Sequence, residues 1–169
     1  AYSLRKNTTA SNNTAVGAYS LQNNTTGADN VALGKHAAKA NTTGYSNVAI
    51  GSNTLESNTT GYQQTALGQG ALNATTTGHS NTAVGYISMV NNITGHSNVA
   101  IGWKSLHDNT SGVRNTSVGY QALDANTTAN YNSAFGYAAL SANITGAENT
   151  AVGSEALIGN TTGSRNVAV

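Results

Sequence analysis

The sequence repeats with a period of 17 residues, and no insertion interrupts the period. We divide the chain into one repeat array, with a partial repeat at 1–12, nine full repeats at 13–165 and a partial repeat at 166–169. Positions 1 to 17 are counted below from the first residue of each unit. The full units begin at Asn13, Asn30, Asn47, Gln64, Asn81, Asn98, Asn115, Asn132 and Asn149. Because the array starts and stops in mid-repeat without terminal units that deviate to form caps, we expect it to be part of a longer fibre.

The consensus unit is N-[TV]-A-[VIL]-G, two variable residues, a small residue, Leu, two variable residues, N-T-T-G and two variable residues. Position 5 is always Gly, and position 15 is Gly in every full unit except the one that contains Ala129. Glycine provides backbone conformations that other residues avoid, so both positions are predicted to be corners. Helical solenoids need longer units, of about 30 residues or more. The pattern therefore predicts an all-β fold, a parallel β-solenoid (β-roll or β-helix) with one coil per repeat and coils about 4.8 Å apart.

Two positions of the unit supply the expected core. Position 4 is always a large apolar residue, and position 9 is Leu or Met in every full unit except the one that has Ala38. The predicted core residues at position 4 are Val16, Leu33, Ile50, Leu67, Val84, Ile101, Val118, Phe135 and Val152. Those at position 9 are Leu21, Leu55, Leu72, Met89, Leu106, Leu123, Leu140 and Leu157.

The strand segment indicates that several chains assemble. Side chains alternate along a strand, so positions 2 and 4 share one face while positions 1, 3 and 5 share the other. Both faces are restricted in sequence, since position 3 is Ala in every full unit except for Ser117. We therefore expect both faces to be covered, and so narrow a coil to need contacts with copies of itself in a homotrimer or fibre. Positions 6, 7, 10, 11, 16 and 17 alone vary, so they are expected to form the solvent face, with the consensus positions purely structural.

Charge and composition limit the kinds of partner that we expect for this chain. Seven Lys and Arg against six Asp and Glu are scattered along the chain and give a net charge of +1, so no basic patch for nucleic acid is expected. No run of about 18 apolar residues is present, so no membrane insertion of this segment is expected. The sequence has no Cys and no motif of an enzyme active site, and we expect neither enzymatic activity nor a cofactor.

The repeats resemble those of known attachment proteins. Asn47-Val48-Ala49-Ile50-Gly51 and Asn98-Val99-Ala100-Ile101-Gly102 resemble the head repeats of trimeric autotransporter adhesins. Residues 115–129 and 132–146 are similar to the N-T-A-V-G-Y-x-A-L…N-T-T-G arrays of phage tail fibres and tail spikes. This resemblance covers essentially the whole chain and implies a trimeric left-handed parallel β-roll or intertwined β-prism used for attachment. The adhesin head unit is shorter than this one, so the coil shape and handedness do not carry over.

Aromatic residues recur at two variable positions. Position 6 holds Tyr86, Trp103, Tyr120 and Tyr137 in consecutive units, and this aromatic row is the candidate surface for a cell-surface glycan, with ring packing that stiffens the rod as the alternative. Position 16 holds Tyr45, Tyr62, His79 and His96, which predicts rings stacked about 5 Å apart. A metal ion held by the two histidines is a weaker hypothesis, and we assign no metal site, because no carboxylate or Cys ligand is near in sequence.

The N-T-T-G segment places an N-x-[ST] sequon in almost every repeat. The candidate N-glycosylation residues are Asn7, Asn24, Asn41, Asn58, Asn73, Asn92, Asn109, Asn126, Asn143 and Asn160. The alternative is an Asn ladder with a turn-forming Thr, because stacking of asparagines in successive coils would require the same residues at these positions.

Two pairs of charged residues complete the candidates. Asp108 and Asp124 are candidate paired carboxylates for glycoside hydrolysis, but they hold different positions in the unit, which favours a solvated surface. Glu148 and Arg165 share position 17 in adjacent units and predict an exposed ion pair worth little.

Three functions fit the pattern. The leading prediction is the structural and adhesive rod of an extracellular, cell-surface or virion attachment fibre. The alternative is a self-assembling extracellular filament, N-glycosylated along its length, that has no receptor. An ice-binding solenoid is disfavoured, because the adjacent Thr residues at positions 13 and 14 point to opposite faces and form no paired Thr plane.

Overall fold

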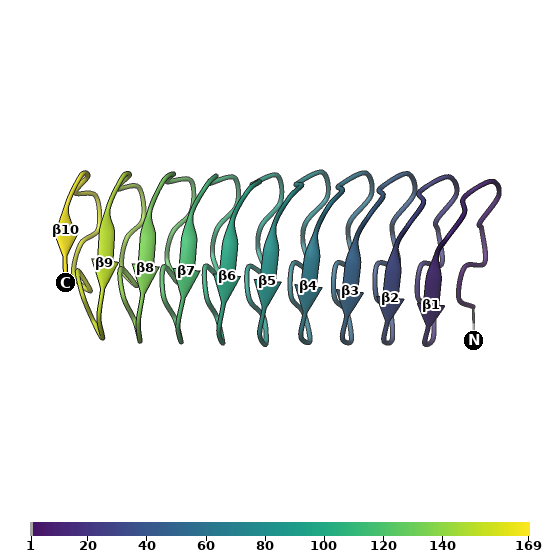
Figure 1. Cartoon of the computed structure of the whole chain (residues 1–169), viewed down its shortest axis with the longest axis horizontal. Coiled ribbons are helices and arrows are strands. Elements are labelled where there is room, and N and C mark those ends of the chain that lie inside the picture. Colours follow the sequence, from purple (N-terminus) through teal and green to yellow (C-terminus); the bar gives the residue numbers. More distant parts are fainter. Residues whose placement is uncertain (1) are drawn as a thin grey trace.

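The computed structural model describes residues 2–169, in which ten strands form one parallel sheet in chain order (Figure 1). The strands are β1 (Thr14–Val16), β2 (Val31–Leu33), β3 (Val48–Ile50), β4 (Thr65–Leu67), β5 (Thr82–Val84), β6 (Val99–Ile101), β7 (Thr116–Val118), β8 (Ser133–Phe135), β9 (Thr150–Val152) and β10 (Val167–Ala168). Each strand pairs with the next at an offset of one repeat, as Thr14 does with Val31. The predicted parallel β-solenoid with one coil per 17-residue repeat is therefore confirmed.

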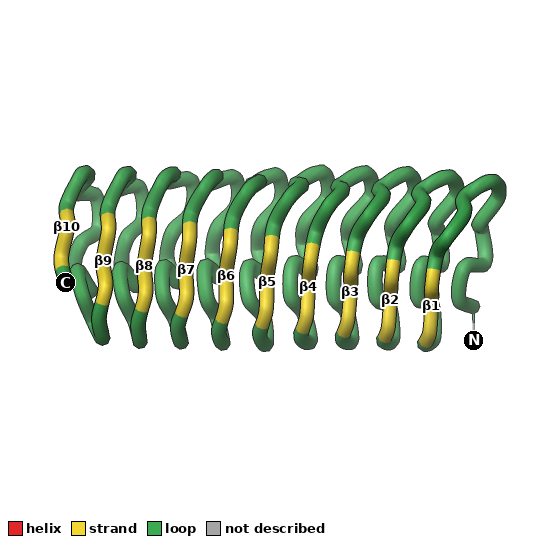
Figure 2. Tube along the Cα trace, viewed as in Figure 1, coloured by secondary structure: helices red, strands yellow, loops and turns green. Residues whose placement is uncertain are grey.

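The coils stack into a straight rod with the two termini at opposite ends (Figure 1). The strands line one side of the rod, and the rest of each coil returns behind them as loops (Figure 2). Within residues 2–169 no helix is long and apolar enough to cross a membrane.

The interior of each coil is a thin layer of small and medium side chains. Position 3 alanines such as Ala32 and Ala100 are fully buried, and they belong to the same cluster as the position 9 side chains. The predicted core at position 9 is confirmed, because Leu21, Leu55, Leu72, Met89, Leu106, Leu123 and Leu140 are fully buried and Leu157 packs against the cluster in part.

The predicted core at position 4 is wrong. Val16, Leu33, Ile50, Leu67, Val84, Ile101, Val118, Phe135 and Val152 lie on the outer face of the sheet, half-buried or exposed. Val16 is 60% exposed and Phe135 is 41% exposed. The physical reason is space, because the leucine at position 9 enters the coil from the return loop and leaves room only for a small side chain, Ala or the buried Ser117, on the facing strand. The restriction at position 3 therefore reflects burial inside the chain's own coil, and it provides no evidence for a second chain.

Two buried asparagine ladders run along the rod. The position 12 side chain donates to the same residue of the preceding coil, as in Asn109 Nδ2 to Asn92 Oδ1 at 2.8 Å, and also to the Gly112 carbonyl at 3.1 Å. The position 1 side chain accepts from the backbone N–H of the next coil, as in Asn115 N to Asn98 Oδ1 at 2.9 Å. These four asparagines are fully buried and hydrogen-bonded, so they help the strands to fix the register of the coils.

The two glycine positions serve different purposes. At position 5 the backbone has a positive φ, such as 132° at Gly102, and the predicted corner is confirmed. At position 15 no positive φ occurs among the described glycines; the reason for glycine is crowding, since a Cβ on Gly44 would lie 2.3 Å from the Gly61 carbonyl oxygen. The remaining tight turns use ordinary residues in the left-handed region at positions 7, 9 and 17, as at Ile87 and Leu106. These turns cost strain that the sequence pattern did not reveal.

Candidate functional site

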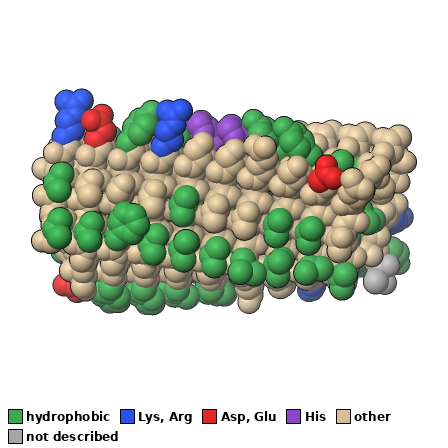
Figure 3. Space-filling model, in the orientation of Figure 1, with side chains coloured by type: hydrophobic (Ala, Val, Ile, Leu, Met, Phe, Trp, Pro, Cys, Tyr) green, Lys and Arg blue, Asp and Glu red, His purple; other side chains and the backbone are tan. Residues whose placement is uncertain are grey.

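The outer face of the sheet is uncharged, with a row of large apolar side chains at position 4 beside a row of Thr, Ser and Val at position 2. Positions 2 and 4 hold no Asp, Glu, Lys, Arg or His in any of the ten strand segments. Leu67, Ile101 and Phe135 are each at least 40% exposed on this face. Figure 3 shows hydrophobic side chains spread along its whole length, with the charged residues gathered near the edges and ends of the rod. We call this surface the sheet face; it can bury apolar area against a partner but offers no charged group to a ligand.

Three of the four rings of the aromatic row at position 6 stack on one another. Trp103 stacks on Tyr120 at 4.6 Å between ring centroids, and Tyr120 stacks on Tyr137 at 5.3 Å. The Lys104 ammonium nitrogen lies 5.1 Å from the Trp103 centroid. A sugar ring cannot stack on a face that a neighbouring ring already covers. The stacked rings therefore present their edges and the Tyr120 and Tyr137 hydroxyl groups to solvent, whereas Tyr86, which is 47% exposed, lies outside the stack.

The predicted stack at position 16 is confirmed. The ring centroids are 5.0 Å apart from Tyr45 to Tyr62, 4.7 Å from Tyr62 to His79 and 4.6 Å from His79 to His96, and the rings are within 7° of parallel. Burial, the neighbouring His79 and Arg114 lower the pKa of His96 from its usual value of 6.5.

This geometry does not suit a metal ion. Parallel stacked imidazoles point their lone pairs in the same direction, whereas two ligands at about 2.0 Å from one zinc must converge on it. Nor do the described residues contain any group of three or more His, Cys, Asp or Glu side chains placed to hold an ion. His79 and His96 therefore form an aromatic ladder.

The structure contradicts N-glycosylation at most of the sequons. Seven of these residues are fully buried in the position 12 ladder, namely Asn24, Asn41, Asn58, Asn92, Asn109, Asn126 and Asn143. A glycan would replace one of the two Nδ2 hydrogens and would have no room in the ladder, yet each of these nitrogens donates both hydrogens, to the preceding coil and to the carbonyl three residues on, as Asn41 Nδ2 does at 2.7 and 2.9 Å. Asn160 makes the same two bonds while partly buried. Asn7 and Asn73 are more accessible, with Nδ2 bonded to the Ala10 and Asn53 carbonyls.

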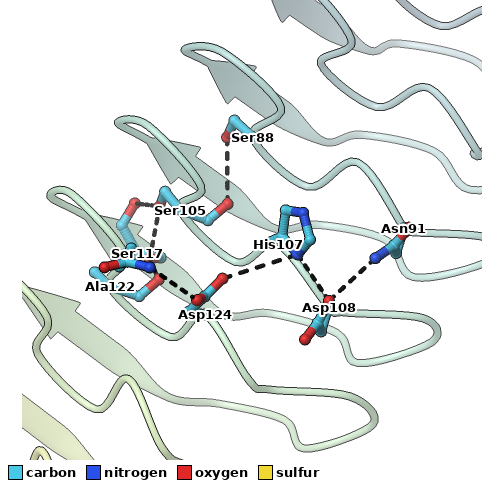
Figure 4. A network of polar contacts seen from close by, with 9 residues as sticks. Ser88, Asn91, Ser105, His107, Asp108, Ser117, Ala122 and Asp124 are labelled. Atoms are coloured by element: carbon cyan, nitrogen blue, oxygen red, sulfur yellow. Dashed lines mark hydrogen bonds and ion pairs between the residues drawn. The ribbon is translucent and has the colours of Figure 1, made fainter.

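The two aspartates lie on opposite sides of one histidine (Figure 4). His107 Nδ1 is 2.7 Å from Asp108 Oδ1 and 3.8 Å from Asp124 Oδ1. Burial raises the pKa of Asp124, against opposing contributions from His107 and Lys104, and its buried Oδ1 has no hydrogen-bond partner. The cluster lies on an open surface, since no pocket is formed by residues 2–169.

The predicted ion pair between Glu148 and Arg165 is confirmed, with Oε2 and Nε 3.0 Å apart. Both side chains are more than half exposed, so the pair contributes little to stability.

An exposed line of hydroxyl groups was missed by sequence reasoning. Position 14 is exposed in all ten coils that contain it, although it belongs to the consensus, so the prediction that only the variable positions face solvent is wrong. We call this set the hydroxyl line: Thr9, Thr26, Thr43, Thr60, Thr77, Thr94, Ser111, Thr128, Thr145 and Thr162. The signal in the sequence was a hydroxyl group in every copy, which was assigned to turn formation.

Comparison of the chain with protein-family models, with curated proteins and with solved structures finds no significant match.

Proposed function

We propose that this β-solenoid is the stiff rod of an extracellular or virion attachment fibre, assembled from copies of itself. The observation that carries the proposal is the uninterrupted register, in which the strands join each coil to the next and both asparagine ladders join all coils except at the fourth, where Gln64 and Thr75 replace the ladder residues. No loop is longer in one coil than in another, so no single point along the rod is an obvious hinge. Such a stiff rod can hold a binding site at a distance from the cell or virion surface.

The sheet face supports self-association. Nine strand spacings and two rows of side chains give an area of about 43 Å by 14 Å, roughly 600 Å² per copy. A stable interface buries about 800 Å² per partner, so we expect the contact to extend beyond these two rows onto residues beside the sheet face. A second copy of the same chain can pack against this face, because two uncharged surfaces meet without repulsion between like charges.

Substitution of one isoleucine on the sheet face tests self-association. Ile101→Lys places a charge on the sheet face, whereas Ile93→Lys places the same charge on a return loop at a similar exposure, 40% against 44%. We expect Ile101→Lys to dissociate the assembly in sedimentation velocity and Ile93→Lys to leave it intact. A wild-type chain that sediments as a monomer would contradict self-association, and a broad distribution of lengths would favour the open filament over a discrete trimer.

Attachment is tested on the aromatic row. The double variant Trp103→Ser/Tyr120→Ser removes the centre of the row, while Tyr131→Ser removes a ring that is 51% exposed at another position of the unit. We expect the double variant alone to lose binding to immobilised cell-surface glycans, with the fold unchanged by circular dichroism. Unchanged binding would exclude the row as the adhesive surface, and dissociation of the assembly would assign it to the interface.

A further inference from the structure

Two adjacent threonines in each repeat have opposite environments. At position 13 the hydroxyl donates to a carbonyl of the next coil, as in Thr42 Oγ1 to Thr59 O at 3.0 Å and Thr110 Oγ1 to Thr127 O at 3.1 Å. At position 14, in the hydroxyl line, no hydroxyl makes a hydrogen bond to any described residue, and every one is exposed to solvent. The fold therefore uses the first hydroxyl and leaves the second free.

Where threonine is replaced, the hydroxyl group that the fold uses is lost and the hydroxyl group that it does not use is kept. Position 13 becomes Ile93 and Ile144 in two coils, which keeps the β-branched shape and discards the hydroxyl. Position 14 becomes Ser111 in one coil, which keeps the hydroxyl and discards the methyl group. If folding alone determined both positions, the bonded hydroxyl should be retained and the free one should be lost. The retained free hydroxyl therefore indicates a requirement from outside the fold.

We propose that the hydroxyl line is a row of O-glycosylation sites. Serine and threonine are interchangeable as acceptors in this chemistry, which matches the single exchange at Ser111. The Oγ atom attacks the anomeric carbon of a nucleotide-activated sugar, and the bond from that carbon to the nucleoside diphosphate breaks. The diphosphate leaves with the bonding electrons, and the hydroxyl proton passes to a base of the transferase.

Charge favours a neutral sugar over a phosphate as the added group. Successive hydroxyl-bearing residues are one coil apart, about 4.8 Å, which is less than the Debye length of about 8 Å at physiological ionic strength. Phosphates on successive coils would each add about −1.5 to −2 charge and would repel one another along the rod. Neutral sugars add no such repulsion to a chain that carries few charges.

The same geometry disfavours ice binding by these threonines. Because the position 13 hydroxyls are already bonded to the carbonyl of the next coil, position 14 leaves a single file of free hydroxyls where a two-dimensional array would be needed. Ser111 also interrupts the row of methyl groups. The proposal does not depend on self-association or on the attachment role, because the hydroxyl line belongs to the return loops and not to the sheet face.

Mass spectrometry of the chain purified from its native source tests the proposal. We expect a ladder of saccharide masses on the intact chain, with fragment ions that place every sugar on position 14. Thr60→Val and Thr59→Val, expressed in the same source, form a matched pair of isosteric changes in adjacent residues. Thr60→Val should lower the maximum number of sugars by one, Thr59→Val should leave it unchanged, and Thr60→Ser should retain it.

Circular dichroism confirms that each variant keeps its fold, so a lost sugar cannot be attributed to unfolding. An unmodified native chain would overturn the proposal, and so would sugars found only on other residues. If the native chain were unmodified and showed thermal hysteresis that Thr60→Val weakened, the hydroxyl line would instead be an ice-binding surface.

Discussion

The fourth full coil offers a test of how the asparagine ladders work, because it alone replaces both ladder residues, with Gln64 at position 1 and Thr75 at position 12. The longer Gln64 amide reaches back to Asn58 Oδ1 at 3.2 Å, the acceptor that a position 12 asparagine would otherwise serve. Its own oxygen accepts from Asn81 Nδ2 at 3.2 Å. The two replacements therefore compensate one another within one buried network.

The double variant Gln64→Asn/Thr75→Asn should restore the pattern of the other coils. In those coils the position 15 carbonyl accepts from both ladder amides, as Gly61 O does from Asn47 at 2.9 Å and from Asn58 at 3.1 Å. Restoring that pattern adds two side-chain hydrogen bonds in net terms, or about 2 kcal/mol of stability at about 1 kcal/mol each.

Each single variant should be worse than the double variant. Gln64→Asn alone leaves the buried Asn58 Oδ1 without its donor, which costs about 1–3 kcal/mol. Thr75→Asn alone directs two amides at that one oxygen. Urea unfolding of the four proteins gives the coupling free energy, which we expect to be at least about 1 kcal/mol, and hydrogen exchange should localise the change to residues 58–92. Single effects that add to within about 0.5 kcal/mol would refute the compensation.

Three further substitutions test the turns and the titrating groups. Gly102→Ala should cost about 3 kcal/mol or more in calorimetry, because the new Cβ would lie 2.4 Å from the glycine carbonyl of the next coil at a φ of 132°. Asp124→Asn should raise the free energy of unfolding at pH 7 and change it little at pH 3, because the raised pKa makes the native carboxylate unfavourable only once it ionises; a loss at pH 7 would contradict this. His96→Gln should reduce the loss of stability as the pH falls below 6.5, because the lowered pKa of His96 means that the unfolded chain takes up the proton first; an NMR titration that finds no lowered pKa would contradict this.

The hydroxyl line marks a limit of sequence reasoning that the structure explains. N-T-T-G predicts a turn whichever threonine faces inward, and the letters alone do not show which hydroxyl is bonded. Only the coordinates place Asn58 and the Thr59 hydroxyl in the hydrogen-bond network and leave Thr60 in water. For the same reason the N-x-[ST] pattern predicts glycosylation at an accessible asparagine, whereas the structure buries this asparagine in the ladder.

The sequence by itself determined the period, the strand segments, the coil-to-coil register and the stacked rings, because a repeat of constant length places equal residues one strand spacing apart. It did not determine which face of the strand is inside. Alternation allows either the alanines or the large residues at position 4 to point inward, and hydrophobicity favours the large ones. The leucine that enters from the return loop reverses that choice: Leu106 and Ala100 together fill the coil, and Ile101 is left outside. That outcome depends on the volume enclosed by the folded coil, which only the tertiary structure determines.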